Sequence, residues 1–363
     1  MTEKEALIML NLAGNLGTIR LKKLLDYFDK PQKILNASLE KLVSFSGIGE
    51  GFAQRISALK EKDLTYELNL AKKLGIKITT LMDEDYPQNL RNIADPPLVL
   101  YIKGKIEEKD NLGLAIVGTR RPTFYGISSA EKFAYALAKK GFTIISGIAR
   151  GIDTVAHRGA LKAKGRTLAV MGSGFLHIYP PENKGLINEI SESGAVISEF
   201  PLNTLPLKQN FPCRNRIISG LSLAVLVIEA GQNSGALITA DFALEQGREV
   251  FALPGKIDSF NSFGTNELIK QGARLVSSVE DILEEFGFSG IISQNKDNSN
   301  KSLRPELTLE EKIIYDLIAE EPVSLEEIVE KTDLELSWVL RIILELEMKG
   351  LIKQLPGKQF VKE

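Results

Sequence analysis

Residues 210–220, with the sequence NFPCRNRIISG, place an aromatic ring and two fixed positive charges directly ahead of an apolar run. The guanidinium groups of Arg214 and Arg216 match the geometry of phosphate oxygens and stay charged at any physiological pH. The ring of Phe211 offers a face on which a nucleic-acid base can stack. A site that holds a polyanion through its phosphates and its bases together uses these residue types.

The same residues also have a structural interpretation, which stays open at this point. The two arginines can pair with carboxylates near the ends of neighbouring strands, such as Asp153, Glu199 or Glu229. Such ion pairs would fix loops without any ligand. The phenylalanine can likewise be a core side chain that anchors its loop.

Glycines and further basic residues follow several other apolar runs. Arg120 and Arg121 come directly after one such run, and Arg150 follows the next. Glycine permits tight turns and lets backbone amides approach an anion. Each glycine alone is explained by a turn, whereas the set with its charged neighbours indicates an anion-binding edge. The glycines concerned are Gly118, Gly147, Gly151, Gly172, Gly174, Gly231, Gly235 and Gly255.

The apolar runs alternate with segments of helical spacing from about residue 112 to residue 288. LAIVG, FTIISG, RTLAVMGSG, AVISEF, LAVLVIEAG, REVFALPG and ARLVSS are strand candidates. Strands that are apolar on both faces and separated by helices predict a mostly parallel sheet covered on both sides. We therefore expect a doubly wound, Rossmann-like α/β domain, whose ligand site lies at the carboxyl ends of the strands.

Known phosphate motifs are missing from this pattern. The turn after the first strand, which starts at Gly118, lacks the further glycines of the dinucleotide fingerprint, and no P-loop sequence occurs. No catalytic triad or paired metal carboxylates stand out. With two histidines and one cysteine, the chain is not expected to hold zinc, and no cofactor is expected.

Composition places limits on the partners. The net charge of the 363 residues is −2, and residues 112–288 carry 18 Lys/Arg against 16 Asp/Glu, so a polyanion site must arise from local placement. A single cysteine excludes internal disulfides and fits a reducing cytosol. No signal peptide is evident, and no apolar run approaches the roughly 20 residues that cross a bilayer.

Three further regions flank or extend the sheet domain. Residues 1–68 are expected to be helical, and FSGIGEGFAQRIS at residues 45–57 resembles a helix-hairpin-helix turn, with a simple packing hairpin as the alternative. Residues 69–288 form the extended Rossmann-like domain, and the Ser-, Asn- and Lys-rich residues 289–304 form a flexible linker. Residues 305–363 have the pattern of a winged helix, with three helices and a hairpin.

The C-terminal region is acidic, with seven Lys/Arg against fourteen Asp/Glu over residues 305–363. Its first helix is expected to begin with a capping box formed by Thr308 and Glu311. Because a DNA-binding winged helix is normally basic, we expect this one to have a structural role or to bind a protein partner.

The sequence resembles the DNA-processing protein A family (DprA/Smf). The matching stretches include IVGTRRPTFYG, ISGIARGIDTVAHRGAL, TLAVMGSGFLHIYPPEN, SEFPLNTLPLKQNFPCRNRIISGLS and VLVIEAGQNSGALITADFALEQGREVFALPG. The resemblance implies a cytoplasmic bacterial protein that is not an enzyme. It implies a homodimer, formed through the Rossmann-like domain, that protects incoming single-stranded DNA and helps to load the RecA recombinase during natural transformation.

The resemblance also assigns roles to residues. Arg120 and Lys208 correspond to basic DNA contacts, and Phe211 to an aromatic that contacts a base. Arg214 and Arg216 match the family's RNR sequence, and either touch DNA or hold the pocket together. The full set of candidate DNA-binding residues is Gly118, Thr119, Arg120, Arg150, Gly172, Gly174, Lys208, Asn210, Phe211, Arg214, Arg216, Ser234 and Gly235.

Two other functions stay open on the sequence. The stretch EAGQNSGALITADFALEQG distantly resembles the phosphate loop of LOG-type nucleotide-processing enzymes, with Glu245 as the candidate acid. Alternatively, the basic residues form internal ion pairs and the chain is a protein-interaction scaffold.

Overall fold

The structure is a computed structural model, and it describes residues 1–14, 18–45, 48–286, 307–318, 322–332, 334–349, 351–355 and 359–362. The chain divides into two compact units, Met1–Ile282 and Leu283–Glu363. Each unit is described by itself. The linker expected at residues 289–304 lies outside the described residues. In the described part of the chain, no helix combines the length and the apolar composition needed to cross a membrane.

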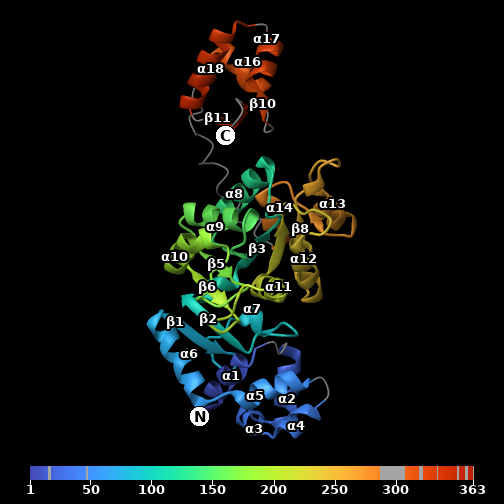
Figure 1. The fold of residues 1–363 in the computed structure, drawn as a ribbon. Coiled ribbons are helices and arrows are strands. Elements are labelled where there is room, and N and C mark those ends of the chain that lie inside the picture. The colour runs from blue at the N-terminus through green and yellow to red at the C-terminus, as the bar shows by residue number, and fades with distance from the viewer. Residues whose placement is uncertain are drawn as a thin grey trace. The chain divides into compact units, whose positions relative to one another are not determined.

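A nine-stranded sheet forms the centre of the first unit, in the order β1-β2-β6-β5-β4-β3-β7-β8-β9 (Figure 1). The seven strands from β6 to β9 in this order run parallel, while β1 and β2 are antiparallel at one edge. The predicted Rossmann-like α/β fold is confirmed. The strands are β1 (Ile76–Thr80), β2 (Val99–Gly104), β3 (Gly113–Val117), β4 (Thr143–Ser146), β5 (Thr167–Val170), β6 (Ala195–Ser198), β7 (Ala224–Val227), β8 (Glu249–Ala252) and β9 (Arg274–Leu275).

The order of the strands creates a switch point beside β3. From β3 the chain adds β4, β5 and β6 on one side, and then returns to add β7 and β8 on the other. Every residue of β3 to β7 is buried, as expected for strands covered on both faces. The loops after β3 and β7 therefore diverge, which is the arrangement that opens a ligand-binding crevice in doubly wound sheets.

Helices cover both faces of the sheet. Ile187 and Ile190 of α10 pack with Ala169 on one face, whereas Ile217 of α11 and Ala240 of α12 pack with the other. The helices α8 and α9 pack against each other and against β4. The helices of this region are α8 (Phe124–Lys139), α9 (Ile152–Lys162), α10 (Lys184–Ser193), α11 (Asn210–Leu221), α12 (Gly235–Glu245), α13 (Phe263–Lys270) and α14 (Val279–Glu285).

The N-terminal region is helical, as predicted, and shares a core with the antiparallel edge of the sheet. Leu7 and Leu10 of α1 pack in one cluster with Val99 and Tyr101 of β2. The expected helix-hairpin-helix turn lies partly outside the described residues. The helices are α1 (Glu3–Leu12), α2 (Thr18–Phe28), α3 (Pro31–Leu35), α4 (Leu39–Val43), α5 (Glu50–Ala58) and α6 (Glu61–Lys73), and α7 (Gln88–Arg91) follows β1.

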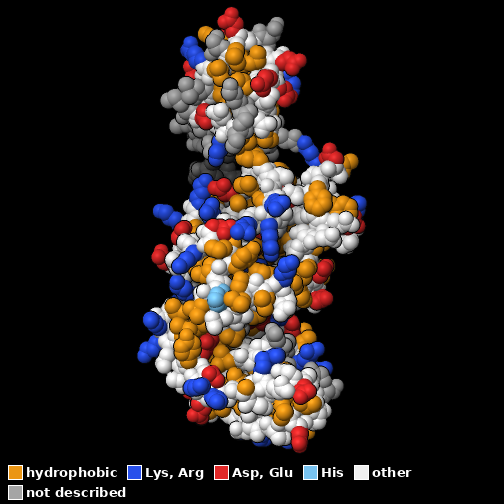
Figure 2. Space-filling view, in the orientation of Figure 1, with side chains coloured by type: hydrophobic (Ala, Val, Ile, Leu, Met, Phe, Trp, Pro, Cys, Tyr) orange, Lys and Arg blue, Asp and Glu red, His pale blue; other side chains and the backbone are white. Residues whose placement is uncertain are grey.

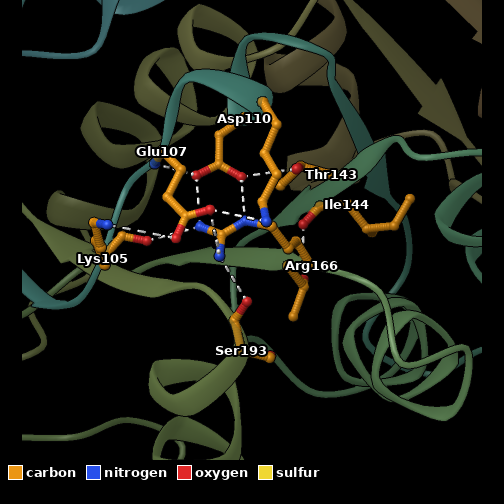
Figure 3. Close-up of polar contacts among 9 residues, drawn as sticks. Lys105, Glu107, Asp110, Thr143, Ile144, Arg166 and Ser193 are labelled. Atoms are coloured by element: carbon orange, nitrogen blue, oxygen red, sulfur yellow. Dashed lines mark hydrogen bonds and ion pairs between the residues drawn. The ribbon is translucent and has the colours of Figure 1, made fainter.

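A polar network fixes the amino-terminal ends of the parallel strands (Figure 3). Arg166, just before β5, binds both carboxylate oxygens of Asp110 at 2.7–2.8 Å and the carbonyls of Lys105 and Ser193 at 2.7 and 2.9 Å. Asp110 also accepts a hydrogen bond from Thr143 at the start of β4. One buried carboxylate and one arginine thus join β2, β4, β5 and α10 at the end of the sheet opposite the predicted site.

The second unit has the winged-helix pattern that the sequence predicts. Three helices pack around a buried apolar cluster, and β10, β12 and β11 form a small antiparallel sheet. The predicted capping box is present, since Glu311 and Thr308 bind each other's backbone amides. The elements are α16 (Leu309–Leu317), β10 (Val323–Ser324), α17 (Leu325–Thr332), α18 (Leu336–Met348), β11 (Ile352–Leu355) and β12 (Gln359–Lys362).

Candidate nucleic-acid interface

The loops after β3 and β4 pack closely at the carboxyl edge of the sheet. Gly151 has a φ of +77°, and a Cβ atom there would lie 2.4 Å from the carbonyl oxygen of Thr119. Thr119 donates its amide to the Glu229 carbonyl at the end of β7 and accepts from the Ile152 amide at 3.2 Å. Only glycine fits at position 151, and the contact places Arg120 at the surface above this junction.

Arg120 and Phe211 meet at this edge. Phe211 lies in the first turn of α11, and the Arg120 guanidinium carbon is 5.4 Å from the centroid of its ring. Beneath the ring, a Cβ atom on Gly172 would lie 2.8 Å from the nearest ring carbon, so glycine at this position lets the ring settle on the loop after β5. The structure therefore brings together three of the sequence-predicted residues, from the loop after β3, the loop after β5 and the first turn of α11.

Tyr179 adds a second ring that the sequence analysis did not identify. It belongs to the loop after β5, its ring centroid is 5.8 Å from that of Phe211, and it is 38% exposed. Arg150 lies over this ring at 5.7 Å. Arg150 also forms a two-pronged ion pair with Glu182, which lowers the pKa of that carboxyl. Tyr179 lies in the IYPPEN stretch, but nothing in that stretch indicates that its ring contacts Phe211.

Lys208, another basic residue predicted to contact DNA, is exposed and lies two residues before the start of α11. Among the described residues, no carboxylate lies within ion-pair distance of its ammonium group. Asn210, by contrast, is buried, and its side-chain amide binds the Leu205 carbonyl at 3.1 Å. Asn210 thus shapes the turn that presents Lys208, rather than facing solvent itself.

Arg214 is buried beneath Phe211. Its guanidinium lies 6.0 Å from the ring centroid and donates to the carbonyls of Gly147 and Val170, which end β4 and β5. Burial lowers the pKa of Arg214 to about 10, and the nearby Asp153 opposes this shift. Burial also raises the pKa of Asp153. Arg214 therefore holds two loop carbonyls from below the surface.

Arg216 is buried as well, and it is paired with two acids. It binds Glu199 through both carboxylate oxygens at 2.7–2.8 Å and Asp95 at 2.8 Å. Burial opposes the charge of Arg216, but Glu199 and Asp95 outweigh it and raise the pKa of the guanidinium. The burial of Arg214 and Arg216 argues against the predicted direct DNA contact, and it favours the alternative that they hold the pocket together.

Two side chains of the N-terminal helices anchor the segment that leads to Lys208. Asn11 of α1 donates to the Glu199 carbonyl at 3.1 Å, and the buried Glu67 of α6 accepts from the Leu202 amide at 2.8 Å. Leu202 is fully buried in the cluster shared with the N-terminal helices. The helical region thus supports the candidate site from behind.

The other predicted residues have structural roles in helix capping and close packing. Ser234 caps α12 by accepting from the Ala236 amide, and the Gly235 carbonyl accepts from Asn215 in the middle of α11. Gly118 and Gly174 serve close packing, since a Cβ atom on Gly174 would lie 2.1 Å from the Pro201 carbonyl oxygen. Glu245 ends α12, roughly 15 Å along the helix from Ser234. The structure therefore does not bring Glu245 together with the capped start of α12.

Figure 2 shows blue basic side chains gathered beside orange apolar ones on the visible face of the first unit. Such a mixture suits a strand of nucleic acid, which presents both phosphates and bases. Among the residues the structure describes, no three His, Cys, Asp or Glu side chains form a group able to hold a metal ion.

Family models match both units of this chain. Residues 77–287 match the model described as DNA recombination-mediator protein A, and residues 299–358 match the DprA winged helix domain. The chain belongs to the DprA/Smf family. Members of this family are DNA recombination mediators, and the resemblance seen in the sequence is confirmed.

Relatives and solved structures agree with this assignment. Protein Smf of a Synechocystis strain is 35% identical over 95% of both chains, and DNA processing protein DprA of Bacillus subtilis is 45% identical over 59% of this chain and 73% of its own. The crystal structure of DprA from Streptococcus pneumoniae covers 78% of this chain and 98% of its own, with 36% identity and a TM-score of 0.67. DprA from Helicobacter pylori, described for its single-stranded DNA binding mode, covers 58% of this chain and 96% of its own, with 32% identity and a TM-score of 0.52.

Proposed function

We propose that this DprA/Smf member binds single-stranded DNA at the carboxyl edge of its sheet and acts as a recombination mediator without catalysing a reaction. The observation that carries the proposal is the surface formed by Arg120, Phe211 and Lys208, which combines a stacking ring with positive groups. The single-stranded DNA binding mode described for the Helicobacter pylori relative supports it.

Fluorescence anisotropy with single- and double-stranded oligonucleotides over a salt series tests this proposal. Affinity should fall with salt, depend weakly on sequence and favour the single strand. The Arg120→Ala, Lys208→Ala double variant should bind all sequences more weakly, and its salt slope should drop by about 1.4, since each phosphate contact on single strands contributes roughly 0.7.

The matched control is the Lys132→Ala, Lys140→Ala double variant, which also removes two positive charges from the first unit. Both lysines are exposed, Lys132 on α8 and Lys140 at the C-terminal cap of that helix, away from the candidate site. If the two double variants bound DNA equally well, the site assignment would be wrong. If the parent chain bound no single-stranded DNA, the proposed function would fail.

We further propose that the chain forms a homodimer through its first unit and helps to load the RecA recombinase onto the bound strand. Large apolar side chains near α13 and β9 support a dimer surface, because exposed apolar patches commonly mark interfaces. They are Ile257, Phe260, Phe263 and Leu275, which are 99%, 75%, 49% and 48% exposed. Light scattering on the parent and on Phe263→Asp tests the dimer, and a strand-exchange assay with purified RecA tests the loading.

The acidic winged helix is proposed to bind a protein rather than DNA. Arg341, a basic side chain of α18, is itself paired with Glu345 at 3.0 Å, which leaves its charge compensated. A fragment of residues 305–363 that bound DNA at moderate salt would contradict this role.

A further inference from the structure

Tyr179 and Phe211 form two similar units side by side. Each ring carries its own guanidinium, since Arg120 lies 5.4 Å above Phe211 and Arg150 lies 5.7 Å above Tyr179. The two ring centroids are 5.8 Å apart and the planes are inclined by 58°. The rings are therefore not stacked on each other, and their faces point in different directions.

The loop that carries Tyr179 is held on both sides of the ring. His177 binds the side chain of Asn203 at 2.9 Å, and its carbonyl accepts from Ser173 at 2.7 Å. On the other side, Asn183 donates to the Ile148 carbonyl at 2.9 Å. These bonds join the loops after β4, β5 and β6, so the backbone that carries Tyr179 is held in place before any ligand arrives. A loop held in this way loses little conformational entropy when a ligand packs on it.

We propose that Tyr179 is a second base-stacking position, so that Phe211 and Tyr179 together take two successive unpaired nucleotides. Nucleotides in a duplex strand rise roughly 3.4 Å each, so rings 5.8 Å apart suit a strand stretched out of its stacked form. The inclination of the rings prevents the two bases from stacking on each other. This inference rests on the proposed binding of single-stranded DNA. It adds a position for a second base, on the ring of Tyr179.

Arg150 distinguishes the second position from the first. Its guanidinium is paired with Glu182, whereas no carboxylate among the described residues pairs with Arg120. A phosphate that approaches Tyr179 must therefore compete with a carboxylate. We expect the second position to be the weaker of the two and to gain affinity in Glu182→Gln, which removes the competing charge.

Substitution of Tyr179 tests the second position in the full chain. Base–aromatic stacking predicts that Tyr179→Ala weakens binding to an oligothymidylate by about 5- to 150-fold. Tyr179→Phe should bind like the parent, because stacking needs the ring and not the hydroxyl. The matched control is Tyr135→Ala on α8, because Tyr135 is 37% exposed and carries Lys139 at 5.7 Å over its ring. That control should leave affinity unchanged.

Photo-crosslinking of the parent protein to an oligonucleotide of 5-iodouracil keeps the inference falsifiable even if Tyr179→Ala fails to fold. Peptide mapping should find crosslinks at both Phe211 and Tyr179. Crosslinks at Phe211 alone, with tight binding by the parent, would overturn the second position and leave the proposed function intact. An absence of binding by the parent would instead refute the proposed function.

Discussion

The Arg120 guanidinium lies over the Phe211 ring, 5.4 Å from its centroid, although one residue follows β3 and the other lies in the first turn of α11. A guanidinium above an aromatic face is attracted by the ring quadrupole and keeps its planar fork available to a phosphate. The pair therefore presents a charge and a stacking surface as one unit at the edge of the sheet.

Arg120→Lys separates the charge of this unit from its planar shape. Lysine keeps the positive charge, so the salt dependence of DNA binding should stay as in the parent. The affinity should still fall severalfold, because an ammonium group lacks the planar fork that binds phosphate with two hydrogen bonds. Salt titrations of the parent, Arg120→Lys and Arg120→Ala check this expectation. An unchanged affinity in Arg120→Lys would show that charge alone matters at this position.

Arg216→Ala should strongly destabilise the first unit, by about 3–5 kcal/mol, because it removes the buried guanidinium and leaves the partly buried carboxylates of Glu199 and Asp95 side by side without their partner. Urea unfolding followed by circular dichroism measures the change. Arg150→Ala is the matched control, because it breaks an ion pair with Glu182 in which both side chains are about half exposed. Its cost should be about 0–1 kcal/mol. Equal costs for the two variants would contradict the structural role of Arg216.

Glu67→Ala should weaken DNA binding without removing any residue from the DNA surface. The variant leaves the Leu202 amide without its acceptor and loosens the segment before Lys208. Glu67→Gln keeps a side-chain oxygen for that amide and should restore affinity. Hydrogen exchange at the Leu202 amide should be fast in Glu67→Ala and slow in the other two proteins. Parent-like affinity in Glu67→Ala would show that the segment needs no support from α6.

His157 should make the first unit less stable in mild acid. Burial lowers its pKa to about 3 from the ordinary value of 6.5. As the pH falls below 6.5, the unfolded chain binds a proton that the folded chain refuses, so stability is lost between pH 6.5 and about 3. Between pH 7 and 5.5 this amounts to about 1 kcal/mol.

Urea unfolding of the parent and of His157→Gln at both pH values isolates this contribution. The glutamine variant has its own packing cost at pH 7. The informative quantity is therefore the loss of unfolding free energy between pH 7 and 5.5, compared between the parent and the variant. The parent should lose about 1 kcal/mol more than the variant on acidification. Identical losses would show that His157 is protonated in the folded protein.

The apolar runs were sufficient to predict the strands and the order of elements along the chain, because a strand buried on both faces has almost no polar residues. They did not reveal that Arg214 and Arg216 are both buried. On an isolated helix these residues point in directions about 160° apart, so one of them would be expected to face solvent. Instead, α11 is buried on all sides from Arg214 to Leu221.

Tyr179 was missed for a related reason. Its contact with Phe211 depends on how the loops after β5 and β6 fold back on each other, and this is fixed by side-chain bonds such as that between His177 and Asn203. Hydrophobic periodicity carries no information about such loops. An aromatic residue shortly after the glycines that end β5 was the available signal, and it becomes useful only when the neighbouring loop is known.

The site is built from loops that lie between residues 118 and 211, and its central strand, β3, completes its pairing only when β7 arrives. The amide of Thr119, next to Arg120, is held by the Glu229 carbonyl just after β7. The backbone that positions Arg120 therefore depends on a strand that follows all of the site loops in the sequence, and the framework of the site is complete only when the chain through β7 has folded.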